Sequence, residues 1–164
     1  MKIRKTLSSN TIKREYKGGT NMLERILVAT DGSEESLAAA KMADQYIEKG
    51  LVKEVHLLNV APNFASANFE MAFSSVEDLN ALTRNYGEKI LDETAKEIEN
   101  RATIVKKVIL GDAPTVICEY AKQHDCGMII MGSRGNSQLK GLLLGSVSTK
   151  VLHYAECPVL IVKA

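Results

Sequence analysis

Four residues late in the chain have the types and the spacing of a phosphate-binding loop. Gly132 and Gly135 follow an apolar run at 128–131, and Gly145 and Ser146 precede an apolar helical pattern. Glycines let a backbone turn tightly and approach a ligand closely, since no side chain intervenes. A helix that begins at Ser146 would add unpaired amides and the positive end of its dipole. This arrangement predicts an anion site, and a phosphate is its expected occupant.

The spacing of this motif separates it from two common nucleotide-binding patterns. No Lys followed by Ser or Thr comes after its last glycine, as a Walker loop requires, and the dinucleotide pattern G-x-G-x-x-G does not occur here. The spacing G-x2-G-x9-G-S resembles the nucleotide-binding motif of the universal stress protein family and matches it at all four positions. The resemblance extends over residues 22–164. The alternative is that the glycines only shape turns and that Ser146 is an ordinary helix cap.

The resemblance implies an adenine nucleotide as ligand, with ATP and an accompanying Mg²⁺ as the expected cofactors. Backbone amides near the first two glycines would wrap the phosphates, and the first turn of the following helix would present amides and hydroxyls to them. No cluster of carboxylates in the sequence resembles a metal cage, so phosphate oxygens and water would hold the Mg²⁺. The expected binding residues are Thr30, Asp31, Val60, Met131, Gly132, Arg134, Gly135, Gly145, Ser146, Val147 and Ser148.

The two charged residues in this set have opposite signs and therefore different expected roles. Asp31 would repel a phosphate, so we expect its carboxylate to accept hydrogen bonds from the adenine. Its alternative role is that of a helix N-cap. Arg134 either neutralises phosphate charge or is only solvated. The family resemblance implies that Thr30, Val60 and Met131 line the base and ribose pocket.

The elements that must position these residues follow a strict alternation. Strands are predicted at residues 24–30, 55–60, 102–109, 127–131 and 157–163, with helical patterns between them. Such alternation implies an α/β fold, in which a parallel sheet has helices on both faces. The resemblance implies a Rossmann-like strand order of 3-2-1-4-5. That order would place Asp31 opposite Gly132, at the carboxyl edge where the direction of winding reverses.

The helices should begin at recognisable caps and bury one apolar face each. Ser33 is the expected cap of the first helix and Asp112 that of the third, with Pro114 in its first turn; Ser74 with Glu77 predicts a capping box for the second. The last helix is expected over residues 146–155. The buried face of the first helix is predicted to contain Leu37, Ala38, Ala40, Met42, Ala43 and Ile47. The second helix, residues 76–100, is predicted to bury Leu79, Leu82, Tyr86, Ile90 and Ile98.

Composition favours a single cytoplasmic domain without a metal site. The chain has 164 residues, and no apolar run approaches the roughly 18 residues that cross a membrane. Three cysteines without a C-x-x-C pair argue against a disulfide framework and favour reduced thiols. The three histidines, His56, His124 and His153, are far apart in the sequence and are expected on the surface.

Charge is distributed unevenly between the first 21 residues and the rest. Residues 1–21 hold six basic side chains and one acidic one, so 6 − 1 = +5, and the remainder holds 15 basic and 19 acidic ones, so 15 − 19 = −4. We expect residues 1–21 to be a disordered tail and residues 22–164 to form the domain. A targeting peptide or an anchor for anionic surfaces is the alternative for the tail. The mildly acidic domain does not favour nucleic acid as a partner.

The function expected from these features is nucleotide binding with little or no turnover. The glycine loop is followed by no Walker Lys, paired acidic residues or evident general base, all of which rapid ATP hydrolysis would favour. A nucleotide-responsive stress or signalling switch is therefore favoured. The alternatives are a slow ATPase or adenylating enzyme, and a phospho-accepting receiver that uses Asp31. The resemblance also implies a homodimer through the last strand, at Val159, Leu160, Ile161 and Val162.

Overall fold

Strands and helices alternate along the whole described chain. The computed structural model describes residues 23–63, 76–135 and 144–164. The strands are β1 (Arg25–Ala29), β2 (Glu54–Ala61), β3 (Thr103–Leu110), β4 (Met128–Gly132) and β5 (Val159–Val162). The helices are α1 (Glu34–Glu48), α2 (Val76–Ala95), α3 (Ala113–Gln123) and α4 (Ser146–Tyr154). Each predicted strand is present, with ends shifted by one or two residues.

The strands form one parallel sheet in the order β3-β2-β1-β4-β5, which confirms the expected topology. The first strand lies at the centre, where Val28 pairs with Leu57 of β2 and with Ile130 of β4. Because β1 has a neighbour on each side and helices above and below, its residues 26–28 are fully buried. This burial on both faces explains why residues 26–29 form a continuous apolar run in the sequence.

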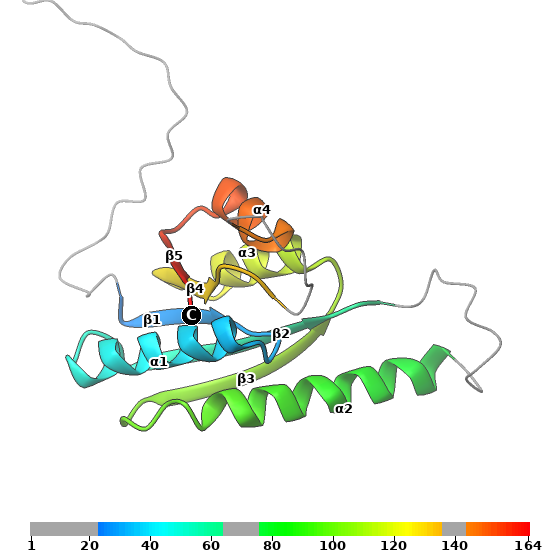
Figure 1. Ribbon diagram of the computed structural model, residues 1–164, viewed down its shortest axis with the longest axis horizontal. Helices are drawn as coiled ribbons and strands as arrows, with labels where there is room; N and C mark the ends of the chain where they lie inside the picture. Colours follow the sequence, from blue (N-terminus) through cyan, green and yellow to red (C-terminus); the bar gives the residue numbers. More distant parts are fainter. Residues whose placement is uncertain (1–22, 64–75, 136–143) are drawn as a thin grey trace, which may run out of the picture.

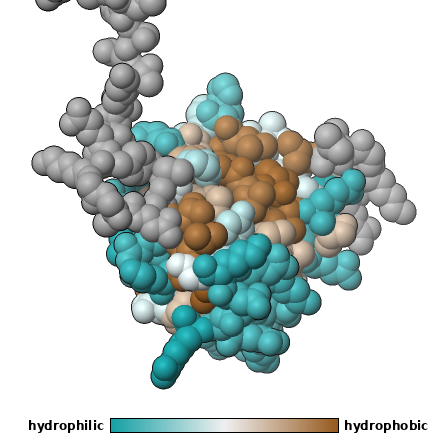
Figure 2. Space-filling view, turned by 90° about the vertical axis from the view of Figure 1, so that its left-hand side faces the viewer, coloured by the Kyte–Doolittle hydropathy of each residue, from teal (hydrophilic) through white to brown (hydrophobic). Residues whose placement is uncertain are grey.

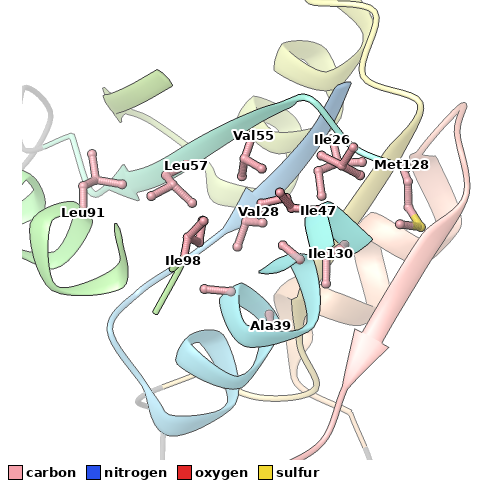
Figure 3. Close-up of a cluster of buried hydrophobic side chains, with 13 residues drawn as sticks. Ile26, Val28, Ala39, Ile47, Val55, Leu57, Leu91, Ile98, Met128 and Ile130 are labelled. Atoms are coloured by element: carbon pink, nitrogen blue, oxygen red, sulfur yellow. The ribbon is translucent and has the colours of Figure 1, made fainter. Parts of the chain in front are cut away.

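The helices cover the two faces of the sheet in pairs. In Figure 1, α1 and α2 lie on one side of the sheet and α3 and α4 on the other. Alternate residues of β1 therefore enter different cores. Ile26 and Val28 pack with Ile47 of α1 and Leu91 of α2, and Figure 3 shows this cluster. Leu27 and Ala29 belong to the second cluster, which includes α3 and α4.

The first helix begins where the sequence predicts it. The Ser33 hydroxyl accepts a hydrogen bond from the Ser36 amide, which confirms Ser33 as the N-cap. The buried face differs by part of a turn from the predicted one, since it consists of Ser36, Ala39, Ala40, Ala43 and Ile47. Leu37, Ala38 and Met42 are only partly buried. Small residues dominate the true face because α1 packs closely on β1 and β4.

The second helix departs from the prediction in its end and in its buried face. It ends at Ala95 rather than at residue 100, because the next amides bond three residues back, as in Ile98 N to Ala95 O. Its buried residues are Gly87, Leu91 and Thr94. Leu82 and Tyr86, expected in the core, are 55% and 65% exposed. Ser74 of the predicted capping box lies outside the described residues.

The remaining elements agree with their local signals. Asp112 caps α3 by accepting from the Thr115 amide, and Pro114 lies in the first turn, as predicted. The last strand is an edge strand that follows Pro158, a residue without an amide hydrogen to donate to a neighbouring strand. Among the described helices, none combines the length and the hydrophobicity that crossing a bilayer requires.

Candidate functional site

A cavity of about 430 Å³ opens at the carboxyl ends of β1, β2 and β4. It is lined by every residue that the sequence predicts to bind the ligand: Thr30, Asp31, Val60, Met131, Gly132, Arg134, Gly135, Gly145, Ser146, Val147 and Ser148. These residues come from four segments, at 30–31, 60, 131–135 and 145–148, which are widely separated in the sequence. The fold therefore brings together what the sequence could only propose separately.

The position of the cavity follows from the strand order. The first and fourth strands are neighbours, with Ala29 opposite Met131 at their carboxyl ends. The chain leaves β1 toward α1 on one face and leaves β4 toward α4 on the other. The connections therefore diverge at this point and leave a crevice between them, as in other doubly wound sheets.

The first turn of α4 offers amides without partners. Its N-cap is Gly145, which has no side chain to accept a hydrogen bond, whereas α1 and α3 are capped by Ser33 and Asp112. The Thr149 amide is the first to bond within the helix, to Gly145 O. Three amides, at residues 146–148, therefore remain at the positive end of the helix beside the cavity. An anion would satisfy them.

The hydroxyl of Ser148 has a different task from its amide. Its Oγ donates to Ser133 O at 2.8 Å, and the residue is only 2% exposed. The Gly145 amide also donates to Ser133 O, at 2.8 Å. Two bonds thus fix the carbonyl of Ser133 against the start of α4. The Ser148 hydroxyl holds the loop in shape, and only its amide is directed by the helix toward a ligand.

Arg134 lines the cavity with a positively charged side chain that has an unpaired hydrogen-bond donor. Its Nε is buried and has no hydrogen-bond partner. The Oγ of the preceding Ser133 is likewise buried and without a partner. A buried donor without an acceptor is costly, and a guanidinium donor more so. The side chain of Arg134 lines the same cavity as the open amides of α4. These residues therefore fit a multiply charged oxyanion such as a phosphate chain.

Asp31 lies against the glycine loop. A Cβ built on Gly135 would overlap Oδ2 of Asp31, so any larger residue there would displace this carboxylate. The other oxygen, Oδ1, accepts from the Ser33 amide at 3.1 Å and from the Ser33 hydroxyl at 2.6 Å. Ser33, not Asp31, is the N-cap of α1, so the capping alternative for Asp31 is wrong. The carboxylate is instead held in a turn at the edge of the cavity.

The turn that carries Asp31 is supported from below by buried polar side chains. Thr30 Oγ1 lies 2.9 Å from Thr94 Oγ1 of α2 and 3.1 Å from Ser36 Oγ of α1. Asn59 Nδ2 donates to Thr30 O at 2.8 Å. All four residues are at most 5% exposed. Thr30 therefore lines the cavity while its hydroxyl ties the end of β1 to two helices.

Half of the described residues that line the cavity were not predicted as part of the site. They come from the strand ends, from α1, from α2 and from α3, and are Ala29, Ser36, Leu58, Asn59, Ala61, Pro62, Thr83, Tyr86, Ile90, Ala113 and Ile117. These residues have no motif spacing and are mostly apolar. The only available signal was the apolar periodicity of α2, which assigned Tyr86 and Ile90 to the core.

Within the described residues, no group of three His, Cys, Asp or Glu side chains could hold a metal ion.

The sequence matches the model of the universal stress protein family over residues 22–163. Universal stress protein MJ0531 of Methanocaldococcus jannaschii is 32% identical over 150 residues, which cover 90% of this chain and 86% of that protein. The structure of the hypothetical protein MJ0577 of the same organism superimposes with a TM-score of 0.73 at 32% identity, covering 87% and 97% of the two chains.

Two more distant structures have the same fold and were solved with ligands. One is a universal stress protein in complex with cAMP, with a TM-score of 0.60 at 23% identity, covering 86% of this chain and 97% of the other. The other is the universal stress protein from Archaeoglobus fulgidus in complex with dAMP, with a TM-score of 0.59 at 19% identity, covering 87% and 99%.

Proposed function

This chain belongs to the universal stress protein family, and on that premise we propose that its cavity binds ATP and that the protein is a nucleotide-responsive stress or signalling switch. The observation that carries the proposal is a group of unpaired hydrogen-bond donors at one cavity. Uncapped amides of α4 and the unpartnered Nε of Arg134 belong to residues that line one cavity. Gly135 lines it too, and a Cβ on this residue would overlap the Asp31 carboxylate. Family members solved with cAMP and dAMP support an adenine nucleotide.

The charges of the site suggest how ATP would lie in it. The phosphates would lie at the start of α4, where the helix dipole and Arg134 are both favourable. Asp31 would repel a phosphate, so its carboxylate would accept from the adenine or ribose side of the nucleotide. Thr30, Val60 and Met131 would line the intervening pocket.

Binding without rapid turnover is the form of activity that we propose. The described residues contain no metal cage, so Mg²⁺ would be held by the phosphates and by water. A bound ion supplies charge neutralisation at the phosphate oxygens. The basic lining residue is Arg134, and neither a His nor a Lys is among the described residues that line the cavity. We expect phosphate release well below about 1 s⁻¹, the lower end of the usual enzyme range.

The switch would act through binding of ATP in the cytoplasm and through a homodimer. ATP would join segments from both halves of the sheet, so its presence favours one arrangement of the loops over another. The dimer would pair the edge strand β5 with its copy. All four residues of β5 are half-buried, and an apolar edge strand is normally covered.

The decisive experiment combines ligand identification with a variant that obstructs these donors. Mass spectrometry of the small molecules released from purified protein should detect an adenine nucleotide. Added ATP with Mg²⁺, at a hundred times its Kd, should stabilise the protein by about 2.7 kcal/mol. Gly145→Val should abolish this stabilisation. A Cβ at Gly145 makes only ordinary contacts of 3.5 Å or more, and its φ of −75° suits any residue, so the variant should fold.

The matched control is Lys150→Val, on an exposed residue of the same helix that does not line the cavity. It should retain the full response to ATP. If the wild-type protein is stabilised by neither ATP, ADP nor AMP, nucleotide binding is ruled out as the function of this cavity. Steady-state phosphate release at about 1 s⁻¹ or faster would instead favour the alternative, an ATP-hydrolysing or adenylating enzyme.

A further inference from the structure

Tyr86 of α2 is both exposed and part of the cavity wall. Tyr86 is 65% exposed, yet this residue lines the cavity together with Thr83 and Ile90. The three residues are spaced by three and four positions, so they lie on one face of the helix. This face is continuous with the one that the sequence assigns to the core. The apolar stripe of α2 thus forms cavity wall over this part of its length.

Close packing of α2 on the sheet explains why Tyr86 reaches the cavity. The next residue, Gly87, is buried, and a Cβ built on it would lie 2.6 Å from Asn59 Oδ1 and 2.8 Å from Val108 Cγ1. The helix therefore lies against β2 and β3 at this point, which glycine alone permits. One turn later, Ile90 packs against the turn at Gly32, 3.4 Å from where a Cβ would lie. These two contacts place the segment of α2 that carries Tyr86 beside the cavity.

The cavity has two chemically different ends. At one end are Arg134 and the open amides of α4, which suit an anion. The lining contributed by the end of β2, by the adjoining Pro62 and by Thr83, Tyr86 and Ile90 of α2 carries no charge. An uncharged end with a large aromatic ring suits a flat, weakly polar group, because nucleobases stack on aromatic side chains.

We propose that Tyr86 is a stacking platform for the nucleobase and that the face of α2 around it forms the base end of the cavity. The inference rests on the proposed function, since it requires that the cavity holds a nucleotide. Tyr86 sets the preference for a ligand with an aromatic base over a bare polyphosphate. Its ring contributes through its face, so the hydroxyl is dispensable.

Calorimetric titration with two ligands tests this role. Tyr86→Ala should weaken ATP binding by about tenfold, the usual effect of removing one stacking side chain. Tyr86→Phe should bind ATP within about twofold of the wild-type protein, because the ring face remains. Inorganic tripolyphosphate, which has no base, should bind all three proteins equally. The control is Leu82→Ala, an exposed residue of α2 that does not line the cavity and should leave both affinities unchanged.

A second readout uses the intrinsic fluorescence, which comes from five tyrosines and no tryptophan. Saturating ATP should quench part of the emission of the wild-type protein and of Leu82→Ala, and this part should be missing in Tyr86→Phe even though it binds ATP. Unchanged ATP affinity in Tyr86→Ala would overturn the stacking role and leave the proposed function intact. An equal loss of ATP and tripolyphosphate affinity would overturn it as well, since Tyr86 would then only shape the cavity. Absence of any nucleotide binding by the wild-type protein would refute the proposed function itself.

Discussion

At the scale of single residues, Arg134 has a charged side chain with a buried donor that no described residue satisfies. Its Nε is buried without a partner, although guanidinium donors are among the strongest in proteins. The neighbouring glycines are constrained in different ways. A Cβ at Gly132 would lie 2.7 Å from Glu35 Cβ and one at Gly135 would overlap Asp31, whereas Gly145 has ordinary space. A side chain would therefore overlap its neighbours at Gly132 and Gly135 but not at Gly145.

We predict that Arg134→Gln lowers the affinity for ATP by about tenfold, the loss expected when one charge-assisted hydrogen bond is removed at a partly exposed site. The measure is the Kd from calorimetric titration. Lys150→Gln is the matched control, because it removes the same charge from an exposed position on α4 outside the cavity. Equal losses in the two variants would mean that Arg134 acts only through overall charge.

At the scale of elements, the second helix is fixed to the rest of the molecule by a chain of buried hydroxyls. The Thr94 hydroxyl donates to Ile90 O at 2.8 Å, so its single proton is used within α2. The Thr30 hydroxyl has one proton and two acceptors within reach, Thr94 Oγ1 at 2.9 Å and Ser36 Oγ at 3.1 Å. The contact with Thr94 joins the end of β1, which carries the Asp31 turn, to the helix that lines the cavity.

We predict that Thr94→Val destabilises the protein by about 1–3 kcal/mol, because the variant loses the buried hydroxyl contact with Thr30 and the bond to Ile90 O while the shape of the side chain is kept. Urea unfolding gives the free energy. Thr94→Ser keeps the hydroxyl and should lose less stability than the valine variant. A valine variant as stable as the wild-type protein would show that the hydroxyl chain does not hold α2.

At the scale of the whole molecule, the carboxyl and amino ends of the sheet differ in structure. The carboxyl end is open, whereas the amino end is closed by an ionic cluster of Arg25, Glu54 and His56. Arg25 Nε donates to Glu54 Oε1 at 2.7 Å, and His56 Nε2 lies 2.6 Å from the same oxygen. His56 is 4% exposed, so its predicted surface position is wrong. Its other nitrogen lies 2.9 Å from the Tyr120 hydroxyl of α3, which joins strand to helix.

This cluster should make stability depend on acid pH. The hydrogen bond from Arg25, and then that from His56, holds the pKa of Glu54 below its usual value. A carboxyl whose pKa is lower in the folded state stabilises the protein above its unfolded pKa, and the contribution is lost as pH falls through the folded pKa. We predict that Glu54→Gln is less stable than the wild-type protein at neutral pH, and that the difference shrinks below about pH 4.5.

Urea unfolding at several pH values measures this difference. Glu48→Gln, on an exposed residue at the end of α1, is the control and should change stability little at any pH. A difference for Glu54→Gln that stays constant from neutral to acid pH would contradict the role of the ionised carboxylate.

The side of the molecule shown in Figure 2 has a contiguous hydrophobic area among hydrophilic residues. The last strand pairs with β4 alone, and Leu152 and Tyr154 of the preceding helix are 43% and 65% exposed. We predict that Ile161→Lys converts the proposed homodimer into a monomer, because a long side chain can carry its charge to the edge of β5. Light scattering after size exclusion gives the mass.

The control for the dimer is Val76→Lys, which places the same charge on an exposed apolar residue of α2. It should leave the mass unchanged, and thermal melting should verify that both variants fold. A wild-type protein that is monomeric at all concentrations would contradict the proposed assembly.

The sequence by itself determined the elements and the outline of the proposed phosphate site, because both depend on neighbours along the chain. Apolar runs indicated five strands, Ser33 and Asp112 marked helix starts, and the glycine spacing identified the loop beside α4. Such signals are local, since turns, caps and open amides depend on residues within a few positions. The strand order came from family resemblance and was confirmed by the fold.

Only the tertiary structure decided which partner each side chain meets. Helical periodicity identified an apolar face on α2 but could not tell core from cavity wall, because both are apolar and recur every three to four residues. Packing at Gly87 decided that Tyr86 borders the cavity. Likewise, the adjacency of Asp31 to Gly135 and the burial of His56 arise where segments distant in sequence meet, and no local pattern encodes such contacts.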